Sequence, residues 1–161
     1  MDKIDFCENC CTLSAGSNKL RKKRRGIMAK VADIKDIGPK YAEKLHTVGI
    51  LTTQALLKKG ATSKGRKEIA ENTAVSEKQI LAWVNHVDLF RVKGVGIEYA
   101  DLLELVGVDT IAELAQRTPE ELHEVIVSNN IKKKLVRQLP SQEQIKHWVA
   151  QAKKLPRVIT Y

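Results

Sequence analysis

An internal repeat constrains the fold of this chain more than any other feature. A shift of 58 residues aligns identical residues over one stretch, pairing Gly38 with Gly96, Tyr41 with Tyr99, Ala42 with Ala100, Leu45 with Leu103 and Val48-Gly49 with Val106-Gly107. Further along the shift becomes 65 residues, and both tryptophans of the chain then match, Trp83 with Trp148. Self-similarity of this kind is typical of a duplicated structural unit. The sequence therefore predicts two tandem units, over residues 33–90 and 91–161.

Both units have the hydrophobic spacing of helices. In the first unit, apolar or small residues recur at helical intervals, at Tyr41, Ala42, Leu45 and Val48. Gly49 follows them at the position where glycine commonly ends a helix. Capping residues precede further apolar stretches, at Thr52 or Thr53, Ser76 with Gln79, Thr110 with Glu113, and Ser141 with Gln144. We predict an all-α fold with about four to five short helices in each unit, and a helix near Arg66–Asn72. Trp83 and Trp148 are predicted to anchor the core.

Each unit begins with a short stretch, a tight turn and a second helix. In "DIGPKYAEKL" the apolar Ile37 precedes Gly38, and Ala42 lies four residues after that glycine. The same positions in the second unit hold Val95, Gly96 and Ala100. The apolar residue is expected to enter the core, the glycine to permit the turn, and the alanine to allow close helix packing. This pattern resembles the helix-hairpin-helix motif of DNA repair and recombination proteins.

Residues 33–161 as a whole resemble a family of small bacterial and archaeal proteins of unknown function built from tandem helix-hairpin-helix units. The resemblance depends on the stretches "GATSKGRKEIAE", "ILAWVN" and "LPRVITY". It implies the fold, but the family has no established activity that could be transferred to this chain.

The hairpin resemblance implies a site for a DNA phosphate at the start of each second helix. The first N–H groups of a helix lack internal partners and favour an anion, and such contacts read no bases. In hairpin one the expected groups are the backbone amides of Gly38, Lys40 and Tyr41, with charge from the Lys40 side chain. In hairpin two they are the amides of Gly94 and Gly96 and those that follow.

Both hairpins depart from the motif. Asp36 occupies the first glycine position of hairpin one, beside the expected phosphate. In hairpin two Glu98 occupies the position that matches Lys40, and Asp101 and Glu104 follow it. An acidic helix face repels DNA, so we expect hairpin two to be the weaker site and mainly structural.

A second basic region lies in "KKGATSKGRK", residues 58–67, which has no acidic residue. Its basic residues are Lys58, Lys59, Lys64, Arg66 and Lys67. The segment 63–66 could open a helix and hold a phosphate, or the whole stretch could be a solvated loop. The basic stretches 132–137 and 153–157 are further candidates.

The first 32 residues are predicted to lie outside the fold, as a disordered tail or as residues foreign to the natural protein, whose start we place at Met28. The tail carries all three cysteines, Cys7, Cys10 and Cys11. No fourth ligand has the spacing for a closed zinc site, so we assign no metal and no cofactor. Since no apolar stretch is long enough to span a membrane and no signal sequence is present, the expected location is the cytoplasm.

The net charge of +9 favours an anionic partner. We therefore expect a non-catalytic protein that binds double-stranded DNA without sequence specificity. The alternative is a protein–protein adaptor that kept the fold without binding DNA, which Asp36 and Glu98 favour. An enzyme is not expected, because the sequence lacks a nucleotide-binding motif, an iron–sulfur cysteine set and a Lys–Asp arrangement of the glycosylase kind. The sequence does not indicate the oligomeric state.

Overall fold

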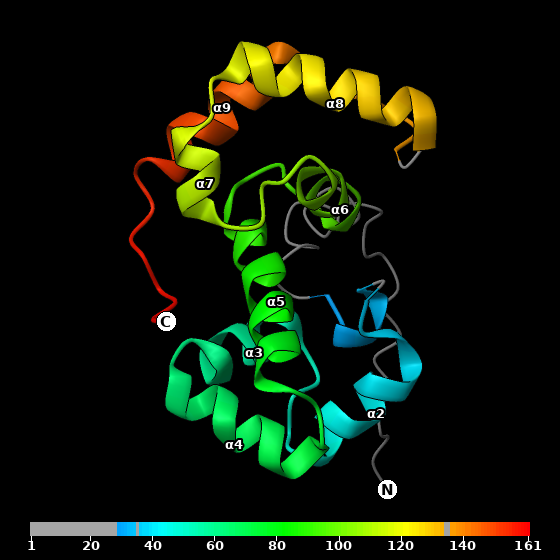
Figure 1. The fold of residues 1–161 in the computed structure, drawn as a ribbon, viewed down its shortest axis with the longest axis vertical. Helices are drawn as coiled ribbons and strands as arrows, with labels where there is room; N and C mark the ends of the chain where they lie inside the picture. The colour runs from blue at the N-terminus through cyan, green and yellow to red at the C-terminus, as the bar shows by residue number, and fades with distance from the viewer. Residues whose placement is uncertain (1–28, 35, 134–135) are drawn as a thin grey trace, which may run out of the picture.

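The computed structural model describes residues 29–34, 36–133 and 136–161 (Figure 1). The predictions for residues 1–27, for Met28 as the start and for the three cysteines lie outside these residues. In chain order the elements are η2 (Val31–Asp33), α2 (Gly38–Thr47), α3 (Thr53–Gly60), α4 (Ser63–Thr73), α5 (Glu77–Asp88), η3 (Leu89–Arg91), α6 (Ile97–Leu105), α7 (Ile111–Gln116), α8 (Pro119–Lys133) and α9 (Gln142–Ala152). The predicted all-α fold is confirmed, and the described residues add only one isolated β-bridge, between Lys30 and Thr52.

The helices pack in two groups around one continuous core. In the first group α3 and α4 pack on α5, and α2 packs on α4; in the second, α7 and α8 pack on α9, and α6 packs on α8. In Figure 1 α5 runs upward from the first group toward α6. The predicted boundary at residue 90 falls within η3, whose Leu89 and Phe90 are buried.

The two groups have closely matching local geometry. The Tyr41 and Trp83 rings lie 5.3 Å apart at 59°, and the Tyr99 and Trp148 rings lie 5.2 Å apart at 53°. Gly49 and Gly107 both have a φ of +76°, where a side chain would be strained, and each ends the helix before it. The duplication of a whole unit stays a prediction, but these contacts occur at the positions that it pairs.

Most helix starts agree with the predicted caps. Thr52 caps α3, and Ser76 caps α5 through its hydroxyl oxygen. Complete capping boxes are found at Thr110 with Glu113 and at Ser141 with Gln144. The helix predicted near Arg66–Asn72 is longer, because the Thr62 hydroxyl accepts the Gly65 amide and starts α4 at Ser63.

The C-terminal segment returns from α9 to the first group of helices (Figure 1). Arg66 binds it there: its guanidinium donates to the carbonyls of Gly60 at 3.0 Å, Ala61 at 3.3 Å and Thr160 at 2.8 Å. The Thr160 amide also donates to the Ala61 carbonyl at 2.8 Å. Arg66 is only 2% exposed, so it differs from the solvent-facing residue that the sequence suggested. It is a structural residue, because three buried carbonyls depend on its charge.

We predict that Arg66→Met lowers the free energy of unfolding by about 2–4 kcal/mol, because it leaves buried carbonyls without a charged donor. Urea denaturation monitored by circular dichroism measures this change. Lys67→Met is the matched control: Lys67 is exposed, so its loss is expected to change stability by about 0.5 kcal/mol or less. Equal stability of the two variants would contradict the structural role of Arg66.

Candidate nucleic-acid interface

Hairpin one has fewer open backbone amides than the sequence suggested. Ile37 is buried as predicted, and Gly38 adopts a φ of +57°. The Gly38 amide donates to the Ile34 carbonyl at 3.1 Å, and Pro39 has no N–H group. Of the three amides predicted to hold a phosphate, those of Lys40 and Tyr41 therefore remain, and that of Gly38 is already bound.

The surface around hairpin one is open and mixed in charge. A side chain at Gly38 would meet nothing within 4 Å. Lys40 is exposed, and the Lys44 ammonium lies 5.8 Å from the centre of the Tyr41 ring. Asp36 is also exposed, so the negative charge identified in the sequence lies on the surface of this turn.

Hairpin two has more open amides. Val95 is buried and its amide donates to the Val92 carbonyl at 3.1 Å. Among the described residues no acceptor is found for the amides of Gly94, Gly96 and Ile97. The number of available donors therefore reverses the expected order of the two hairpins.

The turn of hairpin two is held by α9. The Gln151 side chain accepts from the Lys93 amide at 3.0 Å and donates to the Lys93 carbonyl at 3.3 Å. Tyr99 also holds its helix, since its hydroxyl donates to the Gln138 carbonyl at 3.2 Å. Burial and the charge of Glu98 raise the pKa of Tyr99, which keeps this hydroxyl protonated as a donor.

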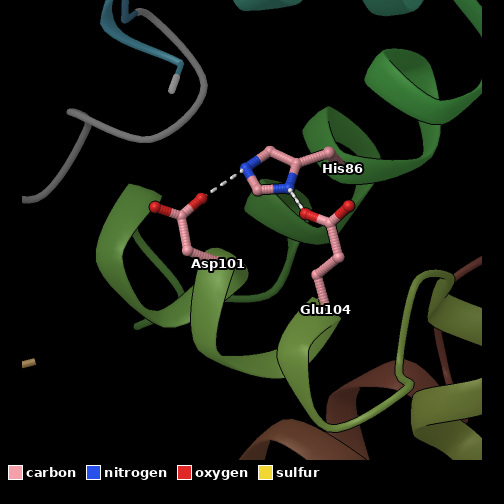
Figure 2. A group of neighbouring side chains, drawn as sticks. All are labelled: His86, Asp101 and Glu104. Atoms are coloured by element: carbon pink, nitrogen blue, oxygen red, sulfur yellow. Dashed lines mark hydrogen bonds and ion pairs between the residues drawn. The ribbon is translucent and has the colours of Figure 1, made fainter. Parts of the chain in front are cut away.

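Two of the three acidic residues on α6 bind a histidine. Figure 2 shows His86 of α5 between Asp101 and Glu104. The distances are 3.3 Å from Nε2 to Asp101 and 3.1 Å from Nδ1 to Glu104, and His86 is 5% exposed. A neutral imidazole carries one N–H, so only the imidazolium can face a carboxylate with each nitrogen. The pKa of Glu104 is lowered by the hydrogen bond from His86, against the opposing effect of burial.

This cluster changes the electrostatics expected for hairpin two. Two carboxylates that were expected to repel DNA share one positive charge, and Glu98 is the exposed acid left beside the turn. The sequence analysis missed His86 because it read the histidines as scattered. One signal was available: at the shift of 65, His86 matches Gln151, the residue that holds hairpin two.

The same cluster is the part of the described chain where a metal ion could be considered. One ligand atom from each of His86, Asp101 and Glu104 lies within 4.8 Å of the others. The two ring nitrogens, however, contact different carboxylates, so one ion could not replace both contacts. The geometry is that of a bridged ion pair between α5 and α6.

The basic region 58–67 is divided between surface and structural residues. Lys58, Lys64 and Lys67 are exposed. The Lys59 ammonium donates to the Val48 carbonyl at the end of α2. A Cβ at Gly65 would lie 1.9 Å from the Lys59 carbonyl oxygen, so this glycine is needed for the packing of α3 on α4. The loop therefore offers three free lysines, while its amide at Gly65 and its arginine serve the fold.

A family model described as a domain of unknown function, DUF4332, matches residues 35–155. The chain belongs to this family. The match extends from hairpin one through α9 and so includes both groups of helices. Comparisons with curated proteins and with solved structures gave no match. Within the described part of this DUF4332 protein, no helix is long and apolar enough to cross a membrane.

We predict that Glu104 makes the stability of the protein pH-dependent in the acid range. Its pKa in the folded protein lies below the ordinary 4.5, so its contribution is fully present above that value. The contribution is lost as the pH falls through the lower folded pKa. Glu104→Gln should therefore give a shallower loss of stability below pH 4.5 in urea titrations.

Glu98→Gln provides the control for this prediction, since it removes one negative charge from the same helix without touching His86. Its stability profile should follow that of the unmodified protein in shape. Identical profiles for Glu104→Gln and the unmodified protein would contradict the assigned ion pair.

Proposed function

We propose that this protein is a non-catalytic DNA-binding module built from two tandem helix-hairpin-helix units, which binds the duplex backbone without reading its sequence. The observation that carries the proposal is shared by both hairpins. Gly38 and Gly96 each precede helical amides at an open surface, and a side chain at either glycine would meet nothing within 4 Å. A rigid, smooth approach to a helix N-terminus suits a phosphate.

Helix geometry supplies the attraction at each site. The first N–H groups of α2 and α6 point along the helix axis toward the turn, at the positive end of the helix dipole. Exposed lysines of the first group extend this potential, at Lys40, Lys58, Lys64 and Lys67. Because such contacts neutralise phosphates and read no bases, binding is expected to be weak, with a Kd of roughly 10⁻⁴–10⁻⁶ M at physiological salt.

A specific observation favours a second function. Asp36 and Glu98 are both exposed beside the turns that would approach the phosphates. Carboxylates in these places suit a protein partner with basic groups, as an adaptor would require. The two functions differ in one measurable property, because duplex binding releases counterions and falls steeply with salt.

We predict that the full-length protein binds a duplex of arbitrary sequence, and that Lys40→Gln weakens this binding and lowers the salt slope by about 1. Fluorescence anisotropy across a salt series measures both quantities. Lys146→Gln is the matched control, since it removes the same charge from α9 in the other group of helices. All variants retain the basic N-terminal segment, so its contribution cancels in the comparison.

Three outcomes distinguish the possibilities. A reduced slope for Lys40→Gln alone assigns the contact to hairpin one. A reduced slope for Lys64→Gln with Lys67→Gln, but not for Lys40→Gln, moves the contact to the start of α4. Absence of duplex binding at low salt would overturn the DNA proposal and favour the adaptor.

A further inference from the structure

Trp148 has an unused hydrogen-bond donor. The residue is 2% exposed and packs against the Tyr99 ring, yet among the described residues no acceptor is found for its indole N–H. Buried tryptophans usually pair this group, because an unpaired polar group loses its hydration without compensation. The two nitrogens of the described chain that are sealed from the surface without a hydrogen bond are Arg66 Nε and His86 Nε2. Trp148 Nε1 is not one of them, so its edge opens to the surface.

That edge lies at the turn of hairpin two. A Cβ placed on Gly94 would lie 3.0 Å from Trp148 Nε1, closer than an ordinary contact. Gly94 also has a φ of +98°, where a side chain would be strained. Glycine is therefore required by the backbone and, in addition, leaves the indole N–H uncovered.

The indole N–H and the open amides of hairpin two converge on one surface. The amides of Gly94, Gly96 and Ile97 have no acceptor among the described residues, and the indole lies beside the first of them. Gln151 fixes the turn through both backbone groups of the exposed Lys93. The site thus combines several N–H donors in a held conformation with a nearby lysine, which is the chemistry that recognises a phosphate.

We propose that hairpin two is a phosphate-binding site in which the Trp148 indole N–H donates to a phosphate oxygen beside the amides of Gly94 and Gly96. For a phosphate of the DNA backbone the inference rests on the proposed function. A free phosphate has the same chemistry and does not require it.

The comparison with hairpin one makes hairpin two the stronger site. Trp83 is also buried, at 3% exposure, and its indole N–H likewise has no acceptor among the described residues. At the position that matches Gly94, however, hairpin one has Asp36, whose exposed carboxylate repels a phosphate. The acidic residues of α6 offer less opposition, because His86 binds Asp101 and Glu104 and leaves Glu98.

The test uses the fact that the chain has two tryptophans, one beneath each hairpin. The full-length protein gives two indole N–H signals in a nitrogen-15 NMR spectrum, which Trp83→Phe and Trp148→Phe assign. On addition of a short DNA duplex at low salt, the Trp148 signal should move in a saturable manner and the Trp83 signal should move much less. Trp148→Phe, which keeps the ring and removes the donor, should weaken duplex binding about tenfold. Trp83→Phe is the matched control and should leave affinity unchanged within about twofold.

The outcomes separate this inference from the proposed function. Duplex binding with an unmoved Trp148 signal would overturn the phosphate site at hairpin two and leave DNA binding intact. If the duplex does not bind, DNA binding fails, and a titration with inorganic phosphate decides the inference: a saturable shift of the Trp148 signal supports it, and an unmoved signal overturns it. The signals are read in the unmodified protein, so the test stands even if Trp148→Phe does not fold.

Discussion

Each hairpin is held in place by a buried tryptophan, and the rest of the structure depends on this contact. Trp83 of α5 packs against Tyr41 of α2, and Trp148 of α9 packs against Tyr99 of α6, at nearly the same distance and angle. A tryptophan buries more apolar area than other side chains, so it can fix a short helix that would be unstable alone. The hairpins are therefore rigid surfaces built on long helices.

Two charged side chains join the halves of the molecule. His86 connects α5 to two carboxylates of α6, and Arg66 connects the start of α4 to the C-terminal segment. Both side chains are nearly inaccessible to water, so each charge is tolerated only because acceptors surround it. The ion pairs also withdraw acidic charge from the surface of hairpin two, which links the packing of the halves to the electrostatics of the proposed site.

The two hairpins have diverged in complementary ways. Hairpin one has the lysine that the motif suggests but has lost two amides, one to the Ile34 carbonyl and one to Pro39. Hairpin two lacks the lysine at the matching position but retains its amides and an uncovered indole N–H. Backbone donors attract a phosphate at short range, whereas exposed lysines act over about one Debye length. Together the hairpins support weak, salt-dependent attachment to a phosphate backbone.

The sequence by itself determined the helical class, the caps and the buried positions, because these follow from local periodicity and from short-range hydrogen bonds. Ile37, Val95 and both tryptophans are buried as the pattern predicts. Only the tertiary structure decided which polar groups are available. Arg66 reads as a loop cation but is enclosed by carbonyls, and His86 reads as isolated but bridges two acids. The availability of a donor depends on acceptors supplied by distant segments, such as Thr160 for Arg66, and local sequence does not encode those contacts.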